Sequence, residues 1–173
     1  MKHFKYFGDS DLRYNTFDEI VEHLPSEIKQ MLLDLKTLRE RPDHHPEPNT
    51  FEHIKIVVNR LLQTKDPDLV LTGIFHDICK LTTNRGHPKT GWPSAPDHPD
   101  CAAEMVDTHR DWIWWFGANP DNVKWLCQHH MAIKQITTMR RNNSKKIEMK
   151  QSPLWDKLIT FSKADDMNNE FKI

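Results

Sequence analysis

The chain has 173 residues, of which 37% are hydrophobic and 28% charged, and its formal net charge is -1. That length suits one domain with a substantial core, and six tryptophans and eight phenylalanines argue against a disordered chain. A net charge near zero gives no general attraction to nucleic acid or to an anionic membrane. No stretch approaches the roughly 18 apolar residues of a membrane span, so we expect no membrane contact.

The cysteines and histidines carry further compositional information. Cys79, Cys101 and Cys127 are widely spaced and odd in number, which is typical of buried, reduced cysteines. The N-terminal sequence lacks the apolar region of a signal peptide. We therefore expect unpaired thiols and a cytoplasmic protein. The chain also has 11 histidines, and histidine is the commonest metal ligand.

Helical periodicity recurs along the N-terminal half, and we expect an all-α fold. Residues 17–38 predict an amphipathic helix that is broken near Pro25. A second helix is expected over residues 49–62, with a capping side chain at its start. The sequence Asp66-Pro67-Asp68 has the features of a helix start, and the helix that follows is expected to run to about Leu81.

The C-terminal half alternates loops with helices. Residues 82–97 are expected to form a long loop, and loops of that length are often functional. Helices are predicted over residues 99–116, ended by a glycine, and over residues 119–130. Residues 134–150 are basic and are expected to be irregular, and a last helix is predicted over residues 153–167.

The sequence GIFHDICKL at residues 73–81 places His76 and Asp77 in the middle of an apolar run. An isolated buried carboxylate is very costly. Because adjacent helical residues point about 100° apart, the two side chains can straddle a cation over their helix. Imidazole nitrogen and carboxylate oxygen are donors that borderline divalent metals accept. A metal site is therefore predicted here, and the simpler alternative is a buried histidine paired with its carboxylate.

Other potential ligands fall on the predicted helices or at their ends. They are His53, His98, His129, His130 and Asp165. Alternatives remain open, because His98 can also cap its helix, and His129 and His130 both serve as ligands only if the site holds two metals. His109 lies about 16 Å along the helix from His98, too far to share a metal. His44 and His45 are expected to be structural or to support the ligands from outside the metal site.

The order of these residues resembles the HD-domain metal-dependent phosphohydrolase superfamily, which has a histidine, then His-Asp in an apolar helix, then a distant aspartate. Here these are His53, HDICK (76–80) and the aspartate of KADDM (163–167). HHPEPNTFEHIKIVVNRLL (44–62) and DHPDCAAEM (97–105) are similar to segments of the HD domain of bacterial tRNA nucleotidyltransferases. The extra histidines resemble those of two-metal members, which include cyclic-dinucleotide phosphodiesterases of the HD-GYP type and CRISPR-associated HD nucleases.

The resemblance covers about residues 41–167 of a single domain, 1–173, with residues 1–40 as an N-terminal helical extension. It departs from the family at Cys79, where glycine is common, and by the absence of the GYP tripeptide, which disfavours cyclic dinucleotides. It implies a compact helical bundle with a central metal site for one or two divalent cations. Manganese, iron, cobalt, nickel and zinc all suit histidine-rich sites.

The resemblance also implies roles for individual residues. One metal would be held by His53, His76, Asp77 and Asp165, and a second by His98, His129 and His130 with Asp77 between the two. A metal lowers the pKa of water towards neutrality, and the hydroxide attacks phosphorus. Asp77 would orient the nucleophile, and Lys80 would neutralise charge that develops on the phosphate.

The substrate implied is a phosphomonoester or phosphodiester of a nucleotide or of a nucleic-acid end. Predicted substrate contacts are Arg85, His87 and Lys89 in the long loop, and Arg140 and Arg141 in the basic segment. Two alternatives stay open. One is a nuclease or an enzyme that processes RNA 2',3'-cyclic phosphate ends, and the other is a non-catalytic, metal-bound nucleotide-binding regulatory module. The sequence leaves the oligomeric state open.

Overall fold

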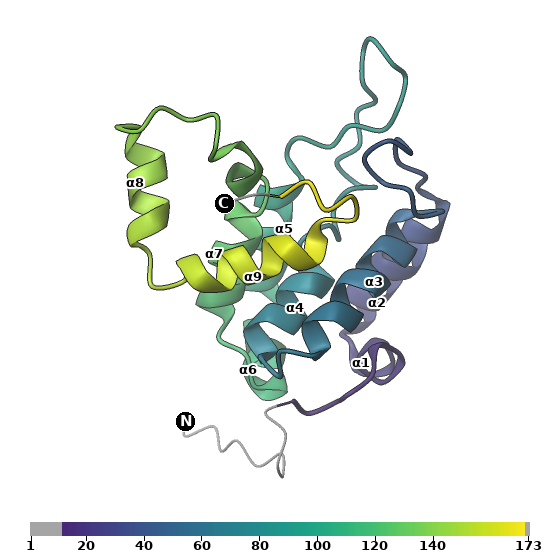
Figure 1. Ribbon diagram of the computed structural model, residues 1–173. Coiled ribbons are helices and arrows are strands. Elements are labelled where there is room, and N and C mark those ends of the chain that lie inside the picture. The colour runs from purple at the N-terminus through teal and green to yellow at the C-terminus, as the bar shows by residue number, and fades with distance from the viewer. Residues whose placement is uncertain (1–11, 172–173) are drawn as a thin grey trace.

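The computed structural model describes residues 12–171, which are all-helical and contain no strand (Figure 1). The predicted all-α fold is confirmed. The α-helices are α1 (Phe17–His23), α2 (Ser26–Asp34), α3 (Thr50–Leu62), α4 (Pro67–Phe75), α5 (His98–Thr108), α6 (Arg110–Phe116), α7 (Pro120–His129), α8 (Ser144–Gln151) and α9 (Trp155–Asp165), and the 3-10 helices are η1 (Leu35–Thr37) and η2 (Ala132–Gln135). Within residues 12–171, no helix has both the length and the apolar character needed to cross a bilayer.

Several helices begin at the side chains that the sequence indicates. Asn49, Asp66 and Asn119 each accept a hydrogen bond from a backbone N–H in the first turn of α3, α4 and α7, respectively. These bonds satisfy amide groups that have no partner inside the helix. Pro25 separates α1 from α2, as expected. The helix starts are therefore determined by local side-chain chemistry.

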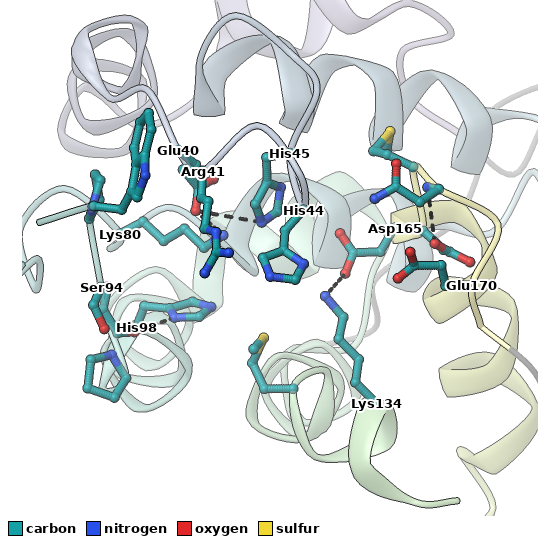
Figure 2. A pocket seen from close by; sticks show the side chains of 18 of the residues that line it. Glu40, Arg41, His44, His45, Lys80, Ser94, His98, Lys134, Asp165 and Glu170 are labelled. Carbon is teal, nitrogen blue, oxygen red and sulfur yellow. Dashed lines mark hydrogen bonds and ion pairs between the residues drawn. The ribbon is translucent and has the colours of Figure 1, made fainter. Parts of the chain in front are cut away.

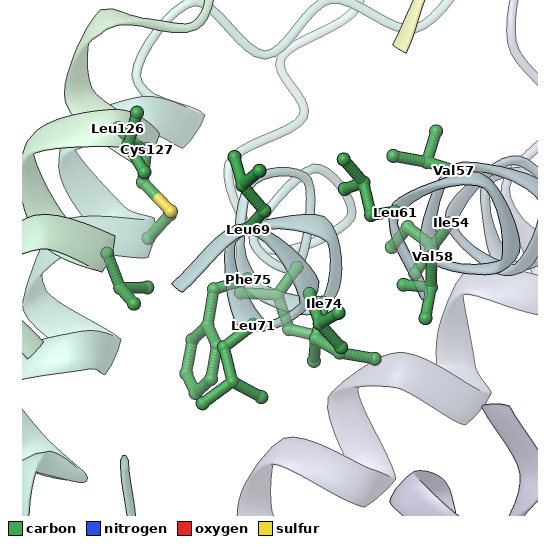
Figure 3. Close-up of a cluster of buried hydrophobic side chains, with 14 of the residues drawn as sticks. Ile54, Val57, Val58, Leu61, Leu69, Leu71, Ile74, Phe75, Leu126 and Cys127 are labelled. Atoms are coloured by element: carbon green, nitrogen blue, oxygen red, sulfur yellow. The ribbon is translucent and has the colours of Figure 1, made fainter. Parts of the chain in front are cut away.

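Helix α4 lies in the interior of the fold, and all nine of its residues are buried. Figure 3 shows its apolar side chains between those of α3 and those of α7. A Cβ atom added to Gly73 would lie 3.0 Å from side-chain atoms of both Val58 and Leu61 in α3. Because glycine has no such atom, α3 and α4 pack closely. This packing brings the end of α4 next to the start of α3, where His53 lies.

The helices share one cluster of buried hydrophobic side chains. It includes Leu12, Phe17 and Ile20 near the N-terminus together with Ile74 in α4 and Phe161 in α9. The described part of the predicted N-terminal extension therefore packs into the same core as the rest. Residues 1–11 of that extension lie outside the described residues.

Three predictions of secondary structure are wrong. Helix α4 ends at Phe75 instead of near Leu81, because the following residues form turns in which backbone N–H groups bond the carbonyl three residues earlier. The helix expected over residues 99–116 is divided at His109, whose backbone leaves helical geometry while its ring bonds Glu27 at 3.0 Å. The basic segment, expected to be irregular, contains α8, which is capped by Asn143.

The expectation of unpaired thiols is also wrong, because Cys79 and Cys101 form a disulfide. Cys127 is free and buried in the core, as expected. The disulfide ties the turn that follows α4 to α5, so it closes the long loop at its base. Consequently, it joins the two segments that carry Asp77 and His98.

Replacing Cys101 with serine is expected to lower the free energy of unfolding. The two cysteines are 22 residues apart, and a cross-link of that span stabilises a fold by about 3 kcal/mol through the entropy of the unfolded chain. Cys101 is only partly buried, so a serine hydroxyl is tolerated there. Urea unfolding of both proteins measures the difference, and a reducing agent should bring the wild type to the stability of the variant. Equal stability without reductant would contradict this expectation.

Candidate metal centre

Six buried side chains converge at one end of α4, and we call them the histidine–aspartate cluster. Each is at most 6% exposed. They come from five helices or helix ends that the core holds together, so their positions depend on the whole fold. The members are His53 in α3, His76 and Asp77 after α4, His98 in α5, His130 after α7 and Asp165 in α9.

The first subsite of this cluster is formed by His53, His76, Asp77 and Asp165. Asp77 Oδ2 lies 3.6 Å from His53 Nε2 and 3.2 Å from His76 Nε2. Asp165 Oδ1 lies 2.9 Å from His53 Nε2 and 3.3 Å from His76 Nε2. Two imidazole nitrogens and two carboxylate oxygens therefore face one small volume.

The second subsite is formed by Asp77, His98 and His130. Asp77 Oδ1 lies 3.1 Å from His98 Nε2 and 3.6 Å from His130 Nε2. These two ring nitrogens are 3.0 Å apart. The two oxygens of Asp77 thus face different subsites, with Oδ2 in the first and Oδ1 in the second.

Hydrogen bonds at the far side of each ring determine what the imidazoles offer to the cluster. The Nδ1 atoms of His76, His98 and His130 lie 2.6–2.9 Å from backbone carbonyl oxygens, and Nδ1 of His53 lies 2.7 Å from a carboxylate oxygen of Glu47. Because these oxygens accept, each Nδ1 donates and carries the proton. The Nε2 atom of each neutral ring is then a lone pair directed into the cluster.

This arrangement is suited to a divalent cation. His76 Nε2 is buried and has no hydrogen-bond partner among the described residues, although buried polar groups are nearly always bonded. Lone pairs that face carboxylates repel unless a positive charge lies between them. The residues of both subsites can hold a metal ion, and their nitrogen and oxygen donors suit manganese, iron, cobalt, nickel or zinc.

Without a metal, protons on the histidines supply part of this positive charge. Burial alone would lower the pKa of His76, but the adjacent Asp77 and Asp165 raise it to about 10. Burial likewise opposes the charged form of His53, but hydrogen bonds to Asp165 and Glu47 raise its pKa. In contrast, burial lowers the pKa of His130 to about 4. The His76 ring thus holds a proton where a cation would bind, and the pKa of His53 is shifted in the same direction.

Two lysines neutralise the carboxylates. Burial alone would raise the pKa of Asp77, but His76 and Lys80 hold it well below its usual value. Burial alone would also raise the pKa of Asp165, but Lys134 and the hydrogen bond from His53 hold it well below its usual value. Both carboxylates are therefore ionised and available as ligands at neutral pH.

His129, which was predicted to be a ligand, does not join the cluster. Its Nδ1 lies 2.8 Å from the carbonyl oxygen of Trp125, and its ring stacks on the Trp125 ring with centroids 4.1 Å apart. Adjacent residues at a helix end point in different directions, and His130 is the one that faces the cluster. The structure thus brings together six of the seven predicted ligands.

A pocket of about 1010 Å³ opens beside the cluster. Figure 2 shows Glu40, Arg41, His45 and Lys80 on one side of it, and Asp165 and Lys134 on another. The ammonium group of Lys80, predicted to be catalytic, lies 2.8 Å from Glu40 Oε1 and 3.1 Å from Asp77 Oδ2. A molecule in this pocket can therefore reach the cluster and both lysines.

The predicted substrate contacts do not all line the pocket. His87 lines the pocket, whereas Arg85, Lys89, Arg140 and Arg141 do not. Arg85 instead forms an ion pair with Asp97. Because the long loop of residues 82–97 folds back on itself, its cations do not all reach the pocket.

Three charged residues close to the cluster were not predicted from the sequence. They are Glu40, which bonds Lys80; Glu47, which bonds His53; and Lys134, which pairs with Asp165. Glu47 lies in the proline-rich sequence before α3, and its position six residues before His53 has no helical periodicity that would reveal the contact. Lys134 belongs to the basic segment, and the sequence does not indicate which cation of that segment lies near the cluster.

The chain was compared with known protein families, with curated proteins and with solved structures, and it matches none of them. Support for a function therefore comes from the geometry of this chain.

Proposed function

We propose that the protein is a metal-dependent phosphohydrolase of the HD-domain type, which cleaves a phosphoester of a small nucleotide. The observation that carries this proposal is the convergence of four imidazole Nε2 atoms on Asp77, whose two oxygens face two subsites. Protein sites that hydrolyse phosphoesters commonly use a pair of metals to activate water and to bind phosphate oxygens. Asp77 and the four rings have the donors for such a pair.

The surrounding residues have supporting roles. A divalent cation held by the cluster would supply Lewis acidity, which lowers the pKa of water towards neutrality so that hydroxide becomes available. Glu47 orients His53 through a 2.7 Å hydrogen bond and increases the basicity of its ring. Lys80 is held by Glu40 at the edge of the pocket, where its positive charge stabilises the negative charge that develops on the phosphate.

The pocket favours a small substrate over a nucleic-acid strand. Its volume of about 1010 Å³ is at the upper end of the range for small-molecule sites. A nuclease would gain from several cations along the path of the strand, but Lys134 is the one cation of residues 134–150 that lines this pocket, and Arg140 and Arg141 do not. Trp92 does line it, and an aromatic ring of this kind stacks on nucleobases.

Hydrolysis of p-nitrophenyl phosphate and bis-(p-nitrophenyl) phosphate by the manganese-loaded protein tests the proposal. We expect cleavage of at least one of the two, and loss of that activity after chelation without unfolding in far-UV circular dichroism. Unfolding on chelation would instead indicate a structural metal. The absence of hydrolysis with manganese, cobalt and nickel would overturn the proposal and favour a metal-bound regulatory module.

A further inference from the structure

Lys134 connects the pocket to the histidine–aspartate cluster. It lies in η2, four residues after His130, and its side chain is 42% exposed. Its ammonium nitrogen lies 3.1 Å from Asp165 Oδ2 (Figure 2). The other oxygen of Asp165 faces the two histidines of the first subsite. Lys134 therefore shares its carboxylate partner with that subsite.

A cation in the first subsite would weaken this ion pair. The metal would draw the negative charge of Asp165 towards itself, and its own positive charge would repel the nearby ammonium group. Lys134 is exposed enough to move, because its remaining surroundings include the open pocket. Metal binding would thus leave a lysine charge beside the metal and without a full counter-charge.

Two other cations that line the pocket, Lys80 and Arg41, each have an ion-pair partner outside the cluster. Lys80 is buried and keeps a second partner, Glu40, at 2.8 Å. Arg41 pairs with Asp43 at 2.7 Å, and neither of those two residues belongs to the cluster. Lys134 differs from both because its ion pair is with a cluster carboxylate alone. Among the described residues, it is the pocket cation best placed to exchange its partner for a ligand.

We propose that Lys134 binds the phosphate group of the substrate, and that it does so once the first subsite holds a metal. Its ammonium group would leave Asp165 and donate hydrogen bonds to non-bridging phosphate oxygens, for which lysine acts as a point charge. This inference rests on the proposed function, since it assigns a substrate contact to that same site. It makes phosphate binding dependent on metal binding.

Binding of inorganic phosphate, measured by isothermal titration calorimetry on the manganese-loaded protein, tests this inference without requiring turnover. We expect Lys134→Met to weaken phosphate binding by about tenfold, which is the effect of losing one charge-assisted hydrogen bond. Lys134→Arg keeps the charge and should restore much of the affinity. Lys145→Met is the matched control, because Lys145 is an exposed lysine of α8 that does not line the pocket.

The manganese affinity of the same variants separates substrate binding from a purely structural role. If Lys134 only neutralised Asp165, Lys134→Met would bind manganese at least as tightly as the wild type and would bind phosphate equally well, which would overturn the inference. An equal loss in Lys145→Met, or no phosphate binding by the loaded wild type, would also overturn it. If phosphate binding depends on Lys134 but no phosphoester is cleaved, the inference stands and the proposed hydrolysis fails.

Discussion

Asp77→Asn is expected to remove metal binding from both subsites and to reduce phosphoester hydrolysis by at least about a hundredfold. Asp77 is the residue whose carboxylate faces both subsites, with one oxygen within 3.6 Å of each pair of histidines. Asparagine has nearly the same size but offers a neutral oxygen and an N–H donor. Loss of a residue that merely orients a ligand lowers metal affinity or activity by about 10- to 100-fold. Loss of a ligand that both subsites share should lower them further.

Asp165 and Asp166 provide controls for this variant. Asp165 Oδ1 faces the first subsite alone, so Asp165→Asn should lose one metal and keep the other. Asp166 accepts hydrogen bonds from the backbone N–H groups of Asn168 and Phe171, so Asp166→Asn should keep both metals. Metal content after dialysis, together with the hydrolysis rate, measures these effects. An Asp77→Asn protein with two bound metals and wild-type activity would contradict the assigned role of this carboxylate.

Metal affinity is expected to rise steeply with pH. In the metal-free protein, the nearby carboxylates outweigh burial and raise the pKa of His76 from 6.5 to about 10. Below that value, the ring nitrogen that would bind the metal carries a proton, and the cation must displace it. Each displaced proton makes binding about tenfold tighter per pH unit. Manganese titrations at about pH 6.5 and pH 8 should therefore differ by more than tenfold.

The stability of the metal-free protein should fall as pH rises, whereas its metal affinity increases. The folded pKa of His76 lies above its unfolded value of 6.5, so its protonated ring stabilises the fold fully below pH 6.5. That contribution is lost as pH rises towards about 10. Thermal unfolding of chelated protein should therefore show a falling midpoint over this range, while stabilisation by added manganese increases. A manganese affinity that does not change with pH would rule out proton displacement at His76.

The all-α fold could be predicted because its signals are local. Amphipathic periodicity indicates which face of a helix is buried, and side chains such as Asn49 and Asp66 mark where helices begin. The order of His53, His76-Asp77 and Asp165 indicated which side chains could meet. Each lies on or next to the apolar side of its helix, and packing of those sides brings the four residues together.

The parts that could not be predicted depend on tertiary structure. The sequence does not distinguish His129 from His130, because the direction of each ring depends on how α7 ends and on its contact with Trp125. The Cys79–Cys101 disulfide depends on the path of the long loop, which has no periodicity. Glu47 reaches His53 because the proline-rich segment folds back on α3, and such turns are not evident from spacing.

The number of manganese ions bound per chain tests the two subsites most directly. Calorimetric titration of the wild type, His53→Ala and His98→Ala would measure it, since His53 faces only the first subsite and His98 only the second. We predict two ions for the wild type and one for each variant. A wild type that binds no manganese, or variants that both keep the wild-type number, would contradict the assignment of the histidine–aspartate cluster as a two-metal centre.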